Sequence, residues 1–459
     1  MRKYKQIISI LAGILTATVT YMLPLEGLSP DGRLTLALTL MTVIFWSLQI
    51  VQSGFISGLY LVLLVIFKAS EPSTVFSPWL GSTIYLVIGA YLIASAVRSS
   101  GLGERIAYNF IIRFVSTYNS IIYSIFILTF ILSLLIPHPM PRAFIIMSVM
   151  SVIIKGADIP RKDASKIGFT VFAAQVPVSM IFLTGDSVIN PLAVQASGQS
   201  VSWMEWLLYM GPPNILASII TCMLILLLFK PECEVSINKI EMRERLCLLG
   251  KMTNTEKRTI VWLAIAVTLW MTDSIHGINI GWITLLIAML MSFPVIGEVI
   301  GLKQLNEVPV NILLFLTAAM AIGKVGAETG MNSWIADTIL PSSLPGNIYI
   351  LAIIIALISM GMHMLLGSVV TVIGIAIPAL LVFTQPMGIN PIAVALLSHT
   401  AIGIHYILPF QHLDVLVGLG DENGMYTQED VIKFGIVLTF VVFIIVLSEI
   451  PYWKLIKLI

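Results

Sequence analysis

The chain has 459 residues, of which 58% are hydrophobic and 11% are charged, and its formal net charge is +1. A soluble domain could not cover so much apolar surface, and the near-neutral charge gives no electrostatic case for nucleic acid as a partner. Three cysteines without CxxC spacing, Cys222, Cys233 and Cys247, argue against a disulfide scaffold or a zinc site. We therefore expect an all-α polytopic membrane protein with no sizeable soluble domain.

Eleven apolar runs qualify as transmembrane helices, because a span needs about 20 apolar residues. The first run follows MRKYKQ and lacks a convincing small-residue cleavage site, so we expect a retained span rather than a signal peptide. In chain order the runs are 7–23, 34–51, 53–68, 79–98, 168–183, 206–229, 259–273, 278–295, 309–325, 391–408 and 431–449.

Two further apolar regions are interrupted midway. Region 118–154 breaks at Pro137–Pro141, and region 346–384 breaks within "SMGMHMLLGS", 359–368. Each is long enough to enter the membrane, turn and leave on the same side. We therefore expect two re-entrant hairpins, with a histidine at each break, His138 and His363.

The polar segment 230–258 divides the single transporter domain, 1–459, into an N-terminal half, 1–229, and a C-terminal half, 259–459. With a cytoplasmic N-terminus, eleven crossings leave 19 of the 25 Lys and Arg residues on the cytoplasmic side. Because cytoplasmic loops are enriched in Lys and Arg, this count predicts a cytoplasmic linker and an external C-terminus. The expected location is the cell membrane.

The two halves also resemble each other, with a first repeat at about 79–229 and a second at about 309–459. The stretch "YLVIGAYLIASAVRSSGLGERIA" resembles "LLFLTAAMAIGKVGAETGMNSWIA", and each precedes an interrupted region. Each half then carries a helix broken by polar residues, "FLTGDSVINPL" and "ILPFQHLDVLVGLG". From His138 to Asp186 is 48 positions, and from His363 to His412 is 49. An odd number of spans per repeat inverts the second copy, and inverted repeats with discontinuous helices indicate a secondary transporter.

The breaks themselves favour a binding site at membrane depth. Irregular backbone is tolerated there only where it is buried in protein or lines water. Helix N-termini attract anions, and exposed carbonyl groups attract cations. Four such breaks would surround one central site, to which His138 and Arg142 add ionisable groups.

Several stretches together resemble the divalent anion:sodium symporter family, the dicarboxylate, citrate and sulfate carriers of the ion transporter superfamily. They are "FWSLQIVQSGFISGLYLVLLVIF", "FSPWLGSTIYLVIGAYLIASAVRSSGLGERIA", "VPVNILLFLTAAMAIGKVGAETGM" and "YILPFQHLDVLVGLG", in an order and spacing similar to that family. The resemblance covers roughly 35–459. It implies a transporter and no enzyme: a homodimer with a scaffold domain and an elevator-type transport domain.

In that family the hairpin tips carry Ser-Asn-Thr. Here the matching tips read Pro137-His138-Pro139 and Met362-His363-Met364. The resemblance implies substrate-binding candidates at Ser133, Pro137, His138, Pro139, Arg142, Thr184, Met362, His363, Met364, Gln411 and His412. It implies ion-coupling candidates at Ser133, His138, Gly185, Asp186, Asn190, Ser359, His363 and Asp414. We expect no cofactor beyond a sodium ion and no metal site.

The altered tips leave the coupling ion open between sodium and a proton, and the histidine and aspartate set favours proton coupling or uncoupled exchange. A structural reading competes at each position: the histidines can bond carbonyl groups at turns, and Asp186 and Asp414 can cap helices. Arg142 can hold an anion bidentately or pair with a structural carboxylate. His399 and His405 do not share a helix face well, so we expect at most one of them at the pathway.

The leading functional hypothesis is secondary active transport of a small anion, most simply a dicarboxylate. The alternatives within the superfamily are a sodium/proton antiporter and an arsenite-type oxyanion permease. From another class, a membrane-embedded metal-dependent hydrolase would use the His and Asp residues, although neither HExxH nor GxSxG occurs in the chain. The expected partners are the anion, the coupling ion and the lipid bilayer.

Overall fold

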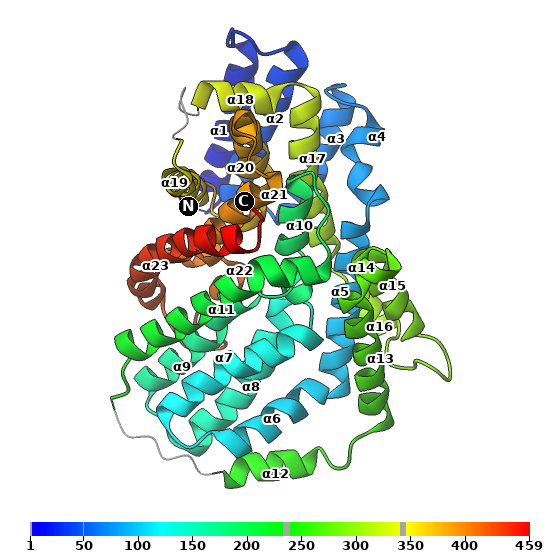
Figure 1. Cartoon of the computed structure of the whole chain (residues 1–459), viewed down its shortest axis with the longest axis vertical. Helices are drawn as coiled ribbons and strands as arrows, with labels where there is room; N and C mark the ends of the chain where they lie inside the picture. The colour runs from blue at the N-terminus through cyan, green and yellow to red at the C-terminus, as the bar shows by residue number, and fades with distance from the viewer. Residues whose placement is uncertain (1, 49, 233–238, 340–345) are drawn as a thin grey trace.

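The computed structural model describes residues 2–48, 50–232, 239–339 and 346–459 (Figure 1). Within these ranges the regular structure is helical, and the β-type pairing is one isolated bridge between Leu419 and Tyr426. This confirms the predicted all-α class.

The helices that precede the polar linker have the following bounds. They are α1 (Arg2–Met22), α2 (Pro30–Ser47), α3 (Ser53–Ile66), α4 (Pro72–Val75), η1 (Ser77–Leu80), α5 (Ser82–Ser100), α6 (Leu102–Phe114), α7 (Tyr118–Leu135), α8 (Pro139–Gly156), α9 (Arg161–Val178), η2 (Leu183–Asp186), α10 (Ile189–Ala196) and α11 (Trp203–Leu228).

The remaining helices lie in the polar linker and in the chain that follows it. They are α12 (Ile240–Leu248), α13 (Asn254–Met271), α14 (Asp273–His276), α15 (Ile280–Leu290), α16 (Leu302–Asn306), α17 (Val310–Glu328), α18 (Met331–Ile339), α19 (Ile348–Leu366), α20 (Val369–Thr384), η3 (Gln385–Met387), α21 (Pro391–Ile404), η4 (Pro409–Gln411), α22 (Leu413–Val417) and α23 (Gln428–Leu455).

Each of the eleven predicted apolar runs falls on a helix. Seven helices in the described ranges are long and apolar enough to cross a membrane: α5, α7, α8, α11, α17, α19 and α23. Shorter apolar helices include α3, α15, α20 and α21. The chain is therefore a multi-pass membrane protein.

The same sequence of elements occurs in both halves. A long helix and a shorter one (α5 and α6, or α17 and α18) are followed by a helical pair, α7 with α8 or α19 with α20. Next comes a helix that stops at an irregular segment with a 3₁₀ turn and resumes as a short helix, α9–η2–α10 or α21–η4–α22. A long helix, α11 or α23, closes each series, and these two pack against each other.

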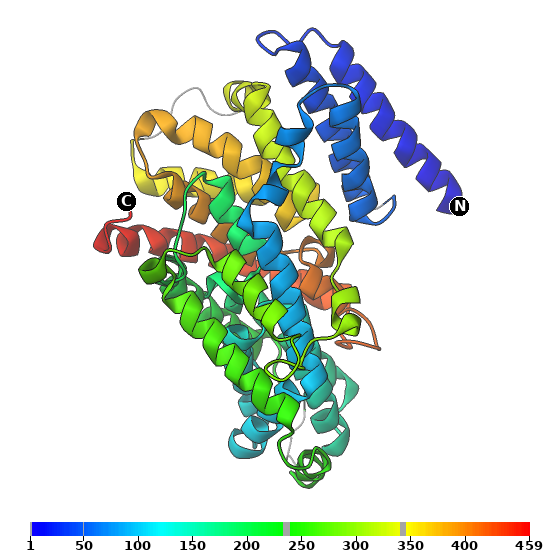
Figure 2. The same ribbon diagram turned by 90° about the vertical axis from the view of Figure 1, so that its right-hand side faces the viewer.

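Two hydrophobic cores hold these elements together. The smaller core joins α2 and α3 to α17 and α18, and its buried residues include Tyr60, Leu64 and Ile322. The larger core joins most of the helices from α5 onward, including α17, with α7 packed on α9 and both α20 and α19 packed on α21. Figure 2 shows α1 to α3 gathered at one end of the molecule beside α17.

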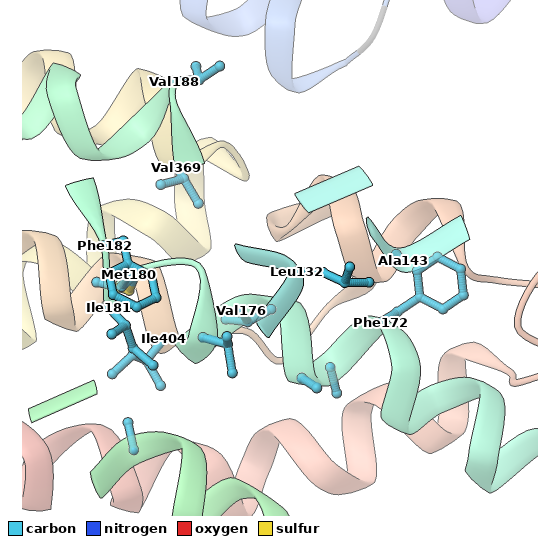
Figure 3. Close-up of a cluster of buried hydrophobic side chains, with 14 of the residues drawn as sticks. Leu132, Ala143, Phe172, Val176, Met180, Ile181, Phe182, Val188, Val369 and Ile404 are labelled. Carbon is cyan, nitrogen blue, oxygen red and sulfur yellow. The ribbon is translucent and has the colours of Figure 1, made fainter. Parts of the chain in front are cut away.

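The interrupted segments are part of the larger core. Met180, Ile181 and Phe182 follow α9 directly and are buried, and Figure 3 shows them packed around Ile404 at the end of α21. These apolar contacts hold irregular backbone in place where a continuous helix would otherwise be needed.

The polar linker contains α12, and Cys233 lies outside the described residues. The other two cysteines are free, with Cys222 buried and Cys247 exposed. After the linker, Glu256 at the start of α13 accepts a 2.6 Å hydrogen bond from Arg105 Nε of α6. This ion pair joins the start of α13 to α6.

Candidate functional site

A cavity of about 730 Å³ lies where both hairpin tips and both broken helices meet. One side is formed by the end of α2 and the beginnings of α3 and α17. The opposite side is formed by the start of α8, the η2–α10 segment, the α19–α20 turn and the η4–α22 segment. Val188 of the first broken helix and Val369 of the second tip both line it and lie near each other in Figure 3. The structure therefore brings together the four interruptions that the sequence singled out.

The first tip is the turn between α7 and α8. Pro139 and Pro141 lack a backbone N–H, so α8 can begin there but α7 cannot continue through them. His138 caps α8, because its Nδ1 accepts a 3.3 Å hydrogen bond from the backbone N–H of Met140. A neutral ring then carries its proton on Nε2 and donates it to Tyr91 Oη, 2.7 Å away. His138 is thus a structural cap and a wall of the cavity at the same time.

The second break lies within the predicted segment 359–368, but the prediction that Met362, His363 and Met364 form its tip is wrong. Helix α19 continues through Met362, His363 and Met364 to Leu366, and the turn is made by Gly367 and Ser368. Gly367 has φ 63°, a left-handed conformation that glycine adopts without strain, and its N–H closes the helix on the carbonyl of His363. Methionine and histidine do not break a helix, so the glycine sets the turn.

The first broken helix is held by side chains that bond its irregular backbone. Asn190 Nδ2 donates to the carbonyls of Ser179 and Phe182, at 2.9 and 3.0 Å. Asp186 Oδ1 accepts from the N–H groups of Val188 and Ile189, at 2.9 and 3.2 Å. Asp186 therefore caps α10 and also faces the cavity.

The second broken helix is held by Gln411. Its Oε1 accepts from the N–H groups of Ile407 and Leu408, both at 2.7 Å, and its backbone carbonyl accepts from His363 Nε2 at 3.2 Å. The second tip and the second break are therefore bonded to each other. Asp414 follows in the first turn of α22 and lines the cavity.

Arg142 does not line the cavity and is completely buried. Its guanidinium donates to the carbonyls of Ile136 and Gly185, at 2.9 and 2.8 Å, to Gln175 Oε1 at 3.2 Å and to Ser179 Oγ at 2.5 Å. These four acceptors come from the first tip, the first break and α9. The side chain therefore joins the tip to the break instead of facing a substrate.

Three histidines gather behind the second tip. The ring centroid of His363 lies 5.8 Å from those of both His405 and His412. All three are buried, and each has a ring nitrogen without a hydrogen-bond partner in the described part of the chain: Nδ1 of His363 and His405, and Nε2 of His412. The sequence predicted at most one of His399 and His405 at the pathway; neither lines the cavity, although His405 lies beside His363.

Six of the predicted site residues line the cavity: His138, Pro139, Asp186, Gln411, His412 and Asp414. The others do not line the cavity: Ser133, Pro137, Arg142, Thr184, Gly185, Asn190, Ser359, Met362, His363 and Met364. Several of these are engaged elsewhere. Ser133 Oγ donates to the carbonyl of Phe130, Ser359 Oγ bonds Ser398 Oγ, and Thr184 Oγ1 accepts from Trp203 Nε1.

Sequence reasoning missed the opposite wall. Trp46 and Ser47 end α2, Gln52 and Ser53 begin α3, and Asn311 begins α17, where its Oδ1 accepts from the N–H of Gly54 at 2.7 Å. These residues lie at the ends of ordinary apolar helices. No interruption or ionisable group marks them in the sequence.

The charged and titratable side chains that line the cavity are two carboxylates and two imidazoles. Asp186, Asp414, His138 and His412 face it, and its described lining contains no Lys or Arg. Elsewhere in the described ranges, no group of three His, Cys, Asp or Glu residues is placed to hold a metal ion. The cavity is thus suited to proton exchange, and polar uncharged groups such as Ser53, Asn311 and Ser368 are available to a solute.

Comparison with known proteins agrees with the predicted family. The chain is 26% identical to the chloroplastic Dicarboxylate transporter 1 of Spinacia oleracea over 72% of its own length and 60% of that protein. It is 24% identical to the putative malate transporter YflS of Bacillus subtilis, over 76% of this chain and 75% of the relative. It is 21% identical to the sodium-dependent dicarboxylate transporter SdcS of Staphylococcus saprophyticus, over 72% and 70%. Because the model of the sodium:sulfate symporter transmembrane region matches residues 4–459, the chain belongs to this family of membrane anion transporters.

Proposed function

We propose that this protein is a secondary transporter that carries a dicarboxylate, such as malate, together with protons. The class of substrate is supported by the names of the relatives, which include dicarboxylate and malate transporters. Coupling to protons is supported by the charges of the cavity, and that observation carries the proposal.

An anion that enters the cavity meets Asp186 and Asp414 and no fixed cation in the described lining. Two like charges about 5 Å apart repel by roughly 3 kcal/mol at an effective dielectric constant of about 20, which is about a hundredfold in affinity. Protonation of the carboxylates, or of His138 and His412, removes this penalty. Anion binding and proton uptake are then thermodynamically linked, and each favours the other.

The second tip supplies a favourable end for the anion. Ser368, Val369 and Val370 line the cavity at the N-terminal end of α20, a helix of 16 residues, where the helix dipole is positive. The first tip contributes fewer backbone donors. Pro139 and Pro141 have no N–H, and the N–H of Met140 is bonded to His138. We infer that one substrate carboxylate lies at the second tip.

The histidine cluster provides a second store of protons. His363, His405 and His412 are close enough that a proton on one disfavours a proton on the next. His412 lines the cavity, and Tyr406, Asp414 and Asp186 are the other titratable groups at the broken helices. We infer that the cluster holds one proton and exchanges it with the cavity through His412.

The movement that exposes the cavity is proposed to be of the elevator type. The cavity lies between the smaller core, which contains α2, α3 and α17, and the body that contains the hairpins and broken helices. The second body would carry the substrate past the first, as a transport domain past a scaffold. We also infer inverted repeats, re-entrant hairpins, a homodimer, a cytoplasmic N-terminus and an external C-terminus.

Uptake of labelled malate into proteoliposomes tests the proposal. An inward proton gradient should drive accumulation, and a sodium gradient at equal pH on both sides should not. Asp186→Asn with Asp414→Asn should strengthen malate binding at pH 8 by about tenfold or more, because the repulsion of roughly 3 kcal/mol is removed. Asp421→Asn is the matched control, since its side chain is 73% exposed on the surface.

Two results would contradict the proposal. Binding of malate that is equally strong at pH 5.5 and pH 8 in the unmodified protein would exclude the linkage between anion and proton. Proton-driven sodium movement without malate transport would instead favour the antiporter alternative, which the two cavity carboxylates also suit.

A further inference from the structure

The guanidinium of Arg142 lies in a cage of neutral oxygen atoms. Arg142 is the fourth residue of α8, and its four hydrogen-bond acceptors are the carbonyls of Ile136 and Gly185, the amide oxygen of Gln175 and the hydroxyl of Ser179. No carboxylate lies within 4.0 Å of it to form an ion pair in the described ranges. The hydrogen bonds of this completely buried cation therefore go to neutral dipoles, while Asp414 and Asp186 interact with it electrostatically from a greater distance.

These oxygen atoms are the kind of ligand set that interrupted helices offer to a free cation. Unwound backbone carbonyls at membrane depth coordinate sodium ions in transporters, with hydroxyl and amide oxygens completing the shell. In this chain the same groups from the first tip and first break converge on Arg142. A guanidinium that accepts no hydrogen bond and stays charged satisfies them permanently.

We propose that Arg142 takes the place of a coupling cation in the first half, so that this half operates without sodium. The family to which the chain belongs is described by sodium symport, and the first tip and break do not fit a sodium ion because Arg142 already uses their inward oxygens. The inference rests on the proposed function, in which the tips and breaks handle the coupling ions.

The second half differs at the matching position. Val372 is the fourth residue of α20, as Arg142 is the fourth of α8, and it is completely buried and apolar. No fixed cation replaces it there. The second break carries instead the titratable rings of His405 and His412 beside His363. The fixed positive charge therefore lies in the first half, and the cluster of three histidines lies in the second.

A tethered cation also changes what the first hairpin can do. A sodium ion would join tip and break only while it is bound, whereas Arg142 joins them at all times. A second bond supports the same contact, because the N–H of Ser187 donates to the carbonyl of Pro137 at 3.3 Å. The first hairpin and first break therefore form one rigid unit.

Removing the guanidinium of Arg142 from its cage of oxygen atoms tests this inference. Purified Arg142→Ser would be unfolded by heat in sodium chloride and in choline chloride of equal ionic strength. The unmodified protein should melt at the same temperature in both salts. The variant should melt lower in choline chloride and recover by about 2 °C in sodium at roughly ten times its dissociation constant, because a ligand of the folded state raises stability.

Three further samples make the result specific. Millimolar guanidinium should also stabilise Arg142→Ser, since it has the shape of the missing group. Arg142→Lys keeps a tethered cation and should show no sodium response, which keeps the proposal testable if the serine variant does not fold. Arg105→Ser removes an arginine that pairs with Glu256, and it should lose stability without recovery in sodium.

A sodium-specific stabilisation of the unmodified protein, equal to that of Arg142→Ser, would overturn the proposal. So would an Arg142→Lys variant that sodium stabilises. These readouts need no substrate. If malate uptake fails while sodium stabilises only Arg142→Ser, the proposed transport of malate is refuted. The inference that Arg142 replaces a coupling cation is then still supported.

Discussion

Replacing Gly367 by alanine should damage the second hairpin tip in two separable ways. Gly367 ends α19 with φ 63°, where a Cβ is disfavoured. A Cβ built there would also lie 2.7 and 2.8 Å from two ring atoms of Phe410, which lines the cavity. The substitution therefore strains the backbone and moves a cavity residue.

The backbone strain at Gly367 and the contact with Phe410 lower the stability by different amounts. The left-handed conformation costs an L-residue roughly 1–2 kcal/mol. The contact with Phe410 is too short for any real Cβ, and making room in a packed site costs typically 1–3 kcal/mol, with the lower end expected because the ring is 42% exposed. Gly367→Ala should thus destabilise the protein by about 2–4 kcal/mol.

Two other glycines provide matched controls. Gly388 has φ 66°, and no atom lies within 4 Å of a Cβ built there. Gly388→Ala should therefore lower the free energy of unfolding only through backbone strain, by roughly 1–2 kcal/mol. Gly361 lies inside α19 and also has nothing within 4 Å, so Gly361→Ala should stabilise by roughly 0.5–1 kcal/mol. The difference between Gly367→Ala and Gly388→Ala isolates the contact with Phe410.

Thermal unfolding in detergent and malate uptake would be measured for all three. The expected melting order is Gly361→Ala, then the unmodified protein, then Gly388→Ala, then Gly367→Ala. Gly367→Ala alone should lower malate affinity, and adding Phe410→Ala should restore part of the stability lost. If Gly367→Ala melts with the unmodified protein, the assignment of the tip to Gly367 is refuted.

Three further predictions concern single contacts. The bond from Arg105 lowers the pKa of Glu256, so its stabilisation is fully present above the unfolded carboxyl pKa of about 4.3 and is lost as the pH falls from there through the lower folded pKa. Glu256→Gln should therefore melt lower than the unmodified protein at pH 7, and the difference should be smaller at pH 3. Asn190→Ala leaves two carbonyls of the first break unbonded and should cost roughly 1–3 kcal/mol, measured by chemical unfolding, with reduced uptake. Thr184→Val leaves the indole N–H of Trp203 unpaired, so we expect a lower melting temperature with unchanged malate affinity; weaker binding would make Thr184 a substrate ligand.

Much of the fold could be predicted because the bilayer imposes strong rules on sequence. Apolar runs must be helices, and interruptions are tolerated only inside protein. The breaks at Pro137–Pro141 and at "FLTGDSVINPL" were therefore located correctly, as irregular segments between α7 and α8 and between α9 and α10. The second tip was predicted four residues too early, at His363, because the resemblance aligned His363 with the family's tip. Histidine and methionine can stay in a helix, and the turn is made by Gly367.

The candidate site was predicted in part, for a different reason. The prediction included His138, Asp186 and Asp414, all of which line the cavity, because each lies at an interrupted segment and these segments meet there. The wall formed by Gln52 and Asn311 could not be found, since it depends on how the smaller core packs against the hairpins. Tertiary packing of ordinary helix ends has no local signature.

The structural and functional readings of Asp186 prove compatible. Its Oδ1 caps α10, as the structural reading expected, while the residue also faces the cavity. A capping bond favours the charged carboxylate, whereas an approaching anion favours the neutral one. The two demands oppose each other within one side chain, so in the proposed function the arrival of the anion would shift its proton occupancy. For Arg142 no such opposition exists, because each of its four hydrogen-bond acceptors favours the charged guanidinium. The charge on Arg142 is therefore fixed, whereas the charge on Asp186 at the cavity can be exchanged.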